Sequence, residues 1–405
     1  MPTHDRYDTI IVGAGIIGLA VARELLARSA GGTATRVLVV ERESSAARHQ
    51  TGHNSGVIHA GVYYAPGSLK ARLCVDGAAR MYDFCADREI DVNRIGKLII
   101  ALAESELPAL EEIERRAKAN GVAGLRRLDA AGLREIEPHA TGVAALHSPN
   151  TGVVDFAIVA AALAADVRAA GGELRFDWEV TSVDPGARAI RLRSAAGDEV
   201  QGGRAVFCAG LWSDRLAVLA GADLDPRIVP FRGGYLRLAP HKRDLVRGLI
   251  YPVPDPSLPF LGVHLTPRID GEVLLGPSAL LVGARDGYAL RTLRAADIAD
   301  IVTWPGTWRM MARWWRTGVN ELRMAGSRDA FAAEASRYVP GIRSEDLLPA
   351  FGGVRAQAVG RDGRLVDDFL LSATPRAIHV RNAPSPAATS SLALAGRIAD
   401  AVDGL

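Results

Sequence analysis

Residues 7–18 are YDTIIVGAGIIG, and this stretch decides the fold class. The apolar run 7–12 predicts a buried strand, and the three glycines after it predict a tight turn that opens a helix. Gly13 suits the turn, Gly15 lets the backbone approach a pyrophosphate, and Gly18 lets the helix pack close to the strand. The stretch therefore predicts an α/β, Rossmann-like unit.

The residues that follow complete this βαβ unit. A helical pattern runs from Leu19 to Ser29, and a second apolar strand runs from Arg36 to Glu41. Glu41 ends that strand, where a carboxylate binds a ribose 2′-hydroxyl and would repel a 2′-phosphate. This context favours a dinucleotide site, and a glycine-rich turn in an unrelated α/β fold is the weaker alternative.

Composition limits the class of protein. The chain has 405 residues, which suits two domains, and its formal net charge of +2 gives no reason to expect a nucleic-acid partner. The three cysteines, Cys74, Cys85 and Cys208, form no disulfide framework and have no metal-ligand spacing. The first apolar run is too short to span a bilayer and lacks a cleavage pattern. We expect a cytoplasmic protein without a metal, attached at most to the inner face of the membrane.

Helical and strand patterns alternate at both ends of the chain, whereas the middle is rich in strand signals interrupted by prolines. This arrangement predicts a Rossmann-like FAD-binding domain with an inserted antiparallel, β-rich substrate domain. The first domain is expected to comprise residues 1–90, 150–225 and 340–405, and the second residues 91–149 and 226–339.

Two further stretches favour FAD over a nicotinamide cofactor. Residues 48–56, RHQTGHNSG, offer hydroxyls, amides and glycine backbone to an extended dinucleotide. Residues 382–391, NAPSPAATSS, lead into the final helix, whose N-terminus suits the polar end of a flavin ring. A plain helix capped by Thr389 or Ser390 explains the second stretch equally well.

Longer strings resemble the L-2-hydroxyglutarate oxidase/dehydrogenase family of the D-amino-acid-oxidase-like superfamily. They are TGHNSGVIHAGVYY (51–64), PGSLKARLC (66–74), YPVPDP (251–256) and PFLGVH (259–264). The resemblance runs from Tyr7 to the C-terminus. It implies a two-domain FAD enzyme that converts L-2-hydroxyglutarate to 2-oxoglutarate and passes electrons to a quinone, oxygen or another acceptor. Two alternatives stay open: a superfamily enzyme acting on an amino acid or glycerol 3-phosphate, and a flavin-binding protein without redox chemistry.

Oxidation of a 2-hydroxy acid needs a hydride acceptor, a base for the hydroxyl proton and cations for the carboxylates. His264 and His59 lie in the family-like strings, and we expect His264 to be the base and His59 to assist. Each has the alternative role of a hydrogen-bonded core histidine. Arg355, after a Gly-Gly pair, matches the place of the superfamily's substrate-carboxylate arginine. For the second carboxylate, Lys97, Arg232 and Arg268 are not distinguished.

The remaining site residues are expected to contact the cofactor. They are Gly13, Gly15, Gly18, Glu41, Arg42, Thr51, His53, Asn54, Ser55, Val180, Ala209, Gly210, Gly353, Pro386, Ala387, Thr389 and Ser390.

A helical stretch at 303–324 is rich in tryptophan and arginine. That composition suits a membrane interface. It also suits a helix packed over the second domain, with its arginines extended to solvent. Packing is favoured because the tryptophans and methionines do not sort onto one face, and peripheral membrane contact is the second expectation.

Overall fold

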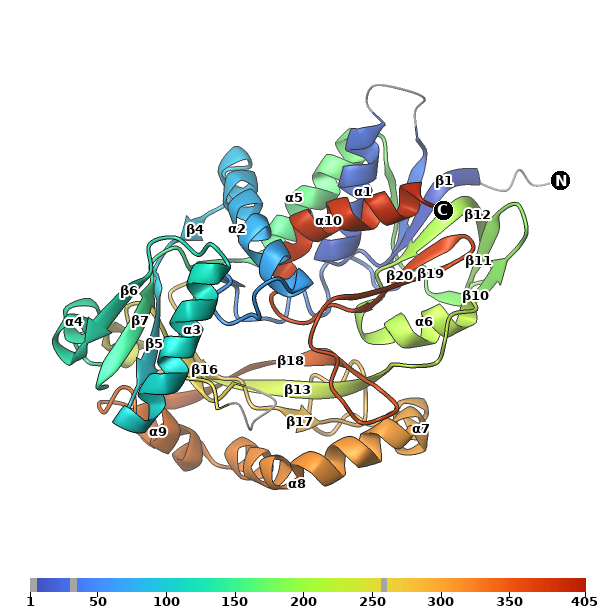
Figure 1. Ribbon diagram of the computed structural model, residues 1–405. Coiled ribbons are helices and arrows are strands. Elements are labelled where there is room, and N and C mark those ends of the chain that lie inside the picture. Colours follow the sequence, from blue (N-terminus) through green and yellow to red (C-terminus); the bar gives the residue numbers. More distant parts are fainter. Residues whose placement is uncertain (1–5, 30–34, 256–260) are drawn as a thin grey trace.

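A computed structural model describes residues 6–29, 35–255 and 261–405. Residues 256–260 lie outside the described residues; they include the last residue of the string YPVPDP and the first two of PFLGVH. Figure 1 shows two β-sheets, one above the other, with helices on the outer side of each.

The first sheet has the parallel centre that residues 7–41 predict. Its central strand is β1, which pairs in parallel with β12 on one side and β2 on the other. Ile10 and Ile11 are completely buried, as expected for a strand covered on both faces. Its members are β1 (Arg6–Val12), β2 (Val37–Val40), β9 (Glu173–Arg175), β10 (Val180–Pro185), β11 (Ile190–Ser194), β12 (Glu199–Phe207), β19 (Leu370–Thr374) and β20 (Ala377–Asn382).

A turn separates β9 from β10, which follow each other closely in the chain. The chain turns at Asp177, whose φ is +54°, because the backbone N–H groups of Asp177 and Trp178 donate to the carbonyls of Glu43 and Glu41. These contacts come from the far end of β2, so no local pattern encodes them.

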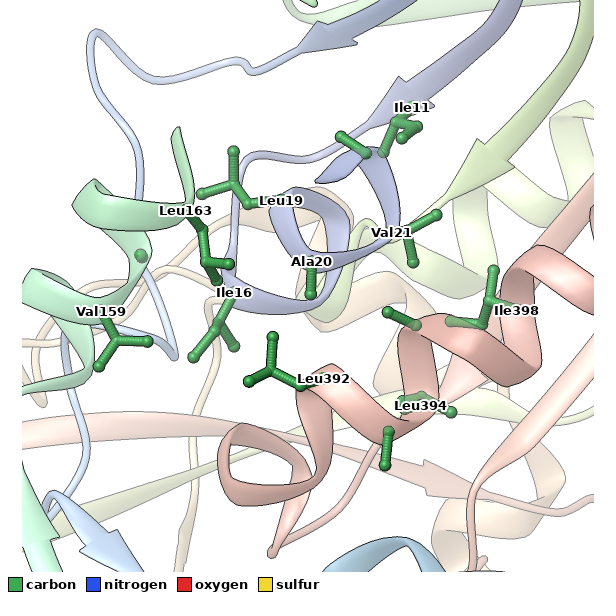
Figure 2. Packing of buried hydrophobic residues seen from close by; sticks show 14 of the residues in the cluster. Ile11, Ile16, Leu19, Ala20, Val21, Val159, Leu163, Leu392, Leu394 and Ile398 are labelled. Atoms are coloured by element: carbon green, nitrogen blue, oxygen red, sulfur yellow. The ribbon is translucent and has the colours of Figure 1, made fainter. Parts of the chain in front are cut away.

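Four helices cover one face of this sheet (Figure 1). They are α1 (Ile16–Arg28), α2 (Leu69–Asp87), α5 (Phe156–Ala169) and α10 (Ala387–Asp403). In Figure 2, Leu19 of α1 lies beside Leu163 of α5, and Leu392 and Ile398 of α10 approach α1 from the other side. Burial of these apolar side chains fixes the helices to the sheet and so fixes the glycine turn before α1.

The second sheet is antiparallel, as predicted, except that β14 runs parallel to β5. Its strands are β5 (Lys97–Ala101), β6 (Arg126–Asp129), β7 (Ala144–Ser148), β13 (Arg227–Leu238), β14 (Leu249–Pro252), β15 (His264–Pro267), β16 (Val273–Gly276), β17 (Leu280–Leu281) and β18 (Leu347–Val359). β18 pairs with β13 over nearly its whole length. Residues 347–359 therefore belong to this sheet, although the segment 340–405 was expected in the first domain.

The remaining elements connect or flank these layers. They are the small sheet β3 (Val57–Ile58), β8 (Gly152–Val154) and β4 (Val92–Asn93), the helices α3 (Leu107–Ala119), α4 (Ala130–Ile136) and α6 (Ser213–Leu219), and the 3-10 turns η1 (Glu104–Glu106), η2 (Gly210–Trp212), η3 (Pro240–Leu245) and η4 (Ser344–Asp346).

Three helices lie on the outer face of the second sheet (Figure 1): α7 (Ala295–Thr303), α8 (Pro305–Gly326) and α9 (Arg328–Ser336). Trp304, directly before α8, and Met310, on α8 itself, are buried, which agrees with packing of this helix over the second sheet. The helix kinks at Trp314. Trp308 and Trp315 are more than half exposed. Within the described part of the chain, no helix is long and apolar enough to cross a membrane.

Candidate active site

The glycine turn between β1 and α1 needs glycine at two of its three positions. Gly13 has φ +108°, and a Cβ there would lie 2.5 Å from the Cys208 carbonyl oxygen. A Cβ on Gly18 would lie 2.0 Å from the carbonyl oxygen of Gly13. Side chains would therefore separate the strand from the helix, and their absence keeps the N-terminus of α1 close to the end of β1.

Glu41 holds this turn from the end of β2. One carboxylate oxygen accepts from the backbone N–H of Ala14 at 2.7 Å, and the other accepts from that of Glu43 at 3.0 Å. Beside Glu41, the Arg42 guanidinium lies over the Trp212 ring at 4.2 Å. The carboxylate thus lies at the mouth of the glycine turn, where a ribose would be bound.

The stretch 48–56 packs against the same turn. Thr51 Oγ1 accepts from the N–H of Ile16 at 3.1 Å, at the start of α1. Asn54 donates to the carbonyls of Gln50 and Thr51 and accepts from the N–H of Gly56. The Asn54 side chain therefore fixes the conformation of this loop by bonding to the loop's backbone, and the Thr51 contact holds the loop against α1.

The N-terminus of α10 lies near the loop that continues from this stretch. Thr389 Oγ1 accepts from the N–H of His59 at 3.1 Å, which ties α10 to residue 59. The N-cap position of α10 is Pro386, and no side chain caps the helix, so neither Thr389 nor Ser390 has the capping role. The N–H of Ala387 donates to the Pro384 carbonyl at 2.9 Å, so the N–H groups of Ala388 and Thr389 are those available to a negatively charged or polar ligand atom.

One large cavity, of about 990 Å³, joins these elements. Of the residues expected to contact the cofactor, it is lined by Gly13, Gly15, Glu41, Arg42, Thr51, His53, Asn54, Ser55, Val180, Ala209, Gly210, Gly353, Pro386, Ala387 and Thr389. Gly18 and Ser390 do not line it. Gly18 serves strand–helix packing, and the backbone at Ser390 is in close contact with Gly77 of α2.

The cavity fits a dinucleotide on its own geometry. It extends from the glycine turn and Glu41 to the N-terminus of α10, and a Cβ on Gly353 would lie 2.2 Å from the carbonyl oxygen of His53. The N-cap residue of α1 is Gly15, which has no side chain, so the turn leaves room beside the start of this helix. The N-termini of α1 and α10 both border the cavity and suit the pyrophosphate and the ring of FAD respectively.

Both candidate histidines line the same cavity. His264 opens β15, its ring is stacked on Tyr251 at 4.1 Å, and its Nδ1 lies 2.9 Å from the carbonyl oxygen of Gly262. Burial lowers its pKa to about 3. His59 follows β3, and burial together with the Lys97 charge lowers its pKa well below 6.5. Both rings are therefore neutral near pH 7.

Arg355 also lines the cavity, from β18, and its charge helps to lower the pKa of His264. The three candidates for the second carboxylate do not line it. Lys97 lies buried behind His59, Arg232 donates to the Tyr288 carbonyl at 2.6 Å, and the Arg268 guanidinium lies over the Phe351 ring at 5.1 Å. Lys97 nevertheless lies against three residues that do line the cavity, His59, Tyr63 and Tyr251.

Lys70 is a lining cation close to His59 that was not given a role from the sequence. It lies on the first turn of α2, its Nζ is 2.8 Å from Asp367, and its charge contributes to lowering the pKa of His59. The sequence signal that could have identified Lys70 as a site residue is its position inside the family-like string 66–74.

Comparison with known proteins agrees with this geometry. Residues 8–401 match the DAO family, described as FAD dependent oxidoreductase. The chain belongs to this family of FAD-dependent oxidoreductases. Its relatives include L-2-hydroxyglutarate dehydrogenases from Nematostella vectensis, 45% identical over 98% of this chain and 90% of the relative, and from Homo sapiens, 44% identical over 98% and 88%. A bacterial one, from Escherichia coli, is 41% identical over 98% of this chain and 94% of the relative.

Solved structures show the same DAO-family fold at low sequence identity. L-α-glycerophosphate oxidase from Mycoplasma pneumoniae, with FAD bound, aligns with a TM-score of 0.80 at 21% identity and covers 98% of this chain and 95% of its own. Glycine oxidase from Geobacillus kaustophilus aligns with a TM-score of 0.71 at 21% identity and covers 99% and 95%.

Four tyrosines of this DAO-family chain also line the cavity and were not assigned a role from the sequence: Tyr63, Tyr64, Tyr235 and Tyr251. Burial raises the pKa of each above 10, so their hydroxyls are neutral donors. The hydroxyl of Tyr63 is buried and has no hydrogen-bond partner among the described residues. Such a group suits a bound ligand oxygen.

Proposed function

We propose that this enzyme oxidises L-2-hydroxyglutarate to 2-oxoglutarate with FAD as the hydride acceptor. The observation that carries the proposal is that two neutral histidines, His59 and His264, line one cavity together with Lys70 and Arg355, the lining cations whose charges act on them. Two cations match the two carboxylates of the substrate, and the histidines supply a base. The relatives that are L-2-hydroxyglutarate dehydrogenases by name support the same substrate.

FAD would be held by the glycine turn, Glu41, the loop 48–56 and the N-terminus of α10. When bound, it supplies a two-electron acceptor for the hydride of the substrate's α-carbon. The chain's own residues bind, orient and deprotonate the substrate.

His264 acts as the base. Its Nδ1 lies beside the Gly262 carbonyl, which can only accept, so the proton of the neutral ring lies on Nδ1 and the lone pair lies on Nε2. Nε2 takes the proton of the substrate hydroxyl as the hydride leaves the α-carbon. Stacking on Tyr251 fixes the plane of the ring, so the lone pair keeps one direction.

Arg355 binds the carboxylate next to the reacting carbon, and Lys70 binds the distal one. The charge of Arg355 bears on His264, whereas that of Lys70 bears on His59. Each cation therefore acts on a different histidine of the pair, which suits a substrate with a carboxylate at each end.

Electrons would pass to an acceptor at a membrane surface, such as a quinone, with the protein on the inner face of the membrane. Apolar side chains on α8 are exposed at positions three or four residues apart: Trp308, Met311, Trp315, Val319 and Leu322. Arg309, Arg313 and Arg316 lie among them in the sequence. An exposed apolar stripe with arginines suits an anionic phospholipid surface.

Anaerobic titration of the purified holoenzyme tests the substrate assignment. L-2-hydroxyglutarate should bleach the flavin absorbance completely, whereas lactate, glycine and glycerol 3-phosphate should bleach it slowly. Faster bleaching by an amino acid or by glycerol 3-phosphate would assign the enzyme to another substrate class. No bleaching by any of them would indicate a flavin-binding protein without redox chemistry.

A further inference from the structure

Lys97 is a buried cation at the start of β5, with 1% of its surface exposed. Its Nζ lies 4.2 Å from the centre of the Tyr251 ring and 5.4 Å from that of Tyr63. No carboxylate of the described residues lies within ion-pair distance of it. Burying an ammonium without a counter-ion is costly, so a retained Lys97 points to a role that an apolar residue could not fill.

That role involves His59, whose Nδ1 lies 3.5 Å from Lys97 Nζ. The backbone of His59 is held on both sides: its N–H donates to Thr389 Oγ1, and its carbonyl accepts from the Cys74 thiol at 3.3 Å. The ring's other nitrogen, Nε2, lies 3.4 Å from Ser385 Oγ. The ring therefore has little freedom other than the choice of which nitrogen carries the proton.

An ammonium has three donors and no acceptor, so a neutral His59 must present its lone pair to Lys97 from Nδ1. The proton then lies on Nε2, on the side of Ser385. His264 has the opposite arrangement, because the Gly262 carbonyl holds its proton on Nδ1. Of two neutral histidines lining one cavity, one thus offers a donor and the other an acceptor.

We propose that Lys97 is the positioning residue that sets this division: it holds His59 as a neutral Nε2–H donor and so leaves His264 as the only base of the pair. The expected effect of Lys97 on the rate rests on the proposed function, whereas its effect on the His59 tautomer does not. Lys97 does not line the cavity, so it acts through the side chains packed against it: it contacts His59 directly, and its charge also helps to keep His264 neutral.

The titration of Lys97 gives a measurable consequence. Burial lowers its pKa from 10.5 to about 7, partly opposed by Cys74, so the ammonium predominates below about pH 7 and is lost as the pH rises. The charged or titratable groups around the Lys97–His59 pair are Tyr63, Lys70, Cys74, Tyr251 and His264. The tyrosines and Cys74 have pKa values raised by burial, and His264 is neutral, so Lys97 is the group among them that titrates near neutral pH.

The direct test is ¹⁵N NMR of the histidine side chains in the substrate-free holoenzyme, with the His59 signals assigned by loss in His59→Gln. A protonated and an unprotonated ring nitrogen have well-separated ¹⁵N shifts. In the unsubstituted protein, His59 should carry its proton on Nε2. In Lys97→Met it should move to Nδ1 or become a mixture. An unchanged Nε2–H tautomer in Lys97→Met overturns the proposal, whatever the substrate proves to be.

The kinetic test compares the same proteins with L-2-hydroxyglutarate. Lys97→Met should lower kcat about 10- to 100-fold, the range typical of groups that orient a functional histidine, with little change in KM. The alkaline decline of kcat/KM near pH 7 should disappear, whereas Lys97→Arg should keep the cation and part of the rate. A kcat equal to that of the unsubstituted enzyme overturns the proposed role even if the tautomer changes.

A matched control exists at another cation–histidine contact. Arg126 Nη2 lies 3.1 Å from His147 Nδ1, and neither residue lines the cavity. Arg126→Met should leave both kcat and the His59 tautomer unchanged. If Lys97→Met did not fold, the pH dependence of the His59 shifts in the unsubstituted protein would decide. They should move as Lys97 loses its proton, and shifts constant from about pH 6 to pH 9 would overturn the proposal.

A stability measurement separates positioning from structural support. Because the buried ammonium is costly, Lys97→Met should have a thermal midpoint at least as high as that of the unsubstituted protein below pH 7, while being slower. A midpoint that falls together with kcat would assign Lys97 to structural support instead.

Discussion

His264 Nδ1 and the carbonyl oxygen of Gly262 lie 2.9 Å apart, across a single intervening residue. This contact fixes the proton of the neutral ring on Nδ1 and leaves Nε2 as a hydrogen-bond acceptor. Because burial lowers the pKa of His264 to about 3, the acceptor form persists through the ordinary working range of pH. The histidine is thus prepared as a base before any substrate binds.

Replacement of His264 tests this role. His264→Ala should lower kcat by about 10²- to 10⁴-fold and leave the FAD content unchanged, since a positioned base contributes a factor of this size. The control is His241→Ala, at a side chain that is 70% exposed. Rates are measured by flavin reduction in stopped flow. A loss of less than about tenfold would transfer the role of base to His59.

The lowered pKa of His264 predicts how kcat/KM of the unsubstituted enzyme depends on pH below neutrality. A base must be unprotonated, so its contribution is present above its pKa and lost below it. With the pKa of His264 lowered to about 3, kcat/KM should not fall as the pH drops through 6.5. An acid limb centred near 6.5 would show that an ordinary, solvated histidine is the base.

Replacements of Arg355 and Lys70 should differ in their effects. Arg355→Ala should weaken kcat/KM for every 2-hydroxy acid, because all of them have the carboxylate next to the reacting carbon. Lys70→Met should weaken it for L-2-hydroxyglutarate and leave lactate almost unaffected. The distal contact is worth about 1–3 kcal/mol, or roughly 10- to 100-fold in kcat/KM. An equal loss for both acids in Lys70→Met would contradict its assignment to the distal carboxylate.

The cofactor cradle depends on the absence of a side chain at Gly353. A Cβ there would lie 2.2 Å from the His53 carbonyl oxygen, a backbone atom that cannot move alone. Gly353→Val should therefore purify with little FAD, measured by the ratio of flavin to protein absorbance. Gly318→Ala is the control, because a Cβ at that position on α8 meets nothing within 4 Å. Full FAD content in Gly353→Val would mean that the loop 48–56 is not part of the cradle.

FAD should be bound without a covalent bond to cysteine. Burial raises the pKa of Cys74 and of Cys208 to about 12, so neither thiol supplies a thiolate near neutral pH. Of the three cysteines only Cys208 lines the cavity. Acid precipitation should release all of the flavin into the supernatant. Flavin that remains with the pellet would contradict this expectation.

The exposed stripe on α8 predicts binding to anionic liposomes. Trp308→Ser with Trp315→Ser should weaken co-sedimentation several-fold, because these rings are 56% and 60% exposed and would enter the lipid interface. Ile158→Ser with Val143→Ser is the matched control, at apolar side chains exposed on other elements. If neither the unsubstituted protein nor the variants sediment with liposomes, the stripe has no membrane role.

The sequence by itself determined the βαβ unit that opens the first sheet. The run 7–12, the three glycines and Glu41 encode a strand, a turn and a carboxylate beside that turn within a short stretch, and local periodicity is enough to recognise them. The sequence also supplied His59, His264 and Arg355, because each lies in or beside a distinctive string.

Only the tertiary structure decided which cations reach the cavity. Lys97 and Lys70 are both buried lysines, but one lies behind His59 and the other lines the cavity. The difference depends on how β5 and α2 pack against segments far away in the chain. The pairing of β18 with β13 and the contact of His59 with Lys97 have the same origin. Burial and side-chain direction are set by partners distant in sequence, which no local pattern specifies.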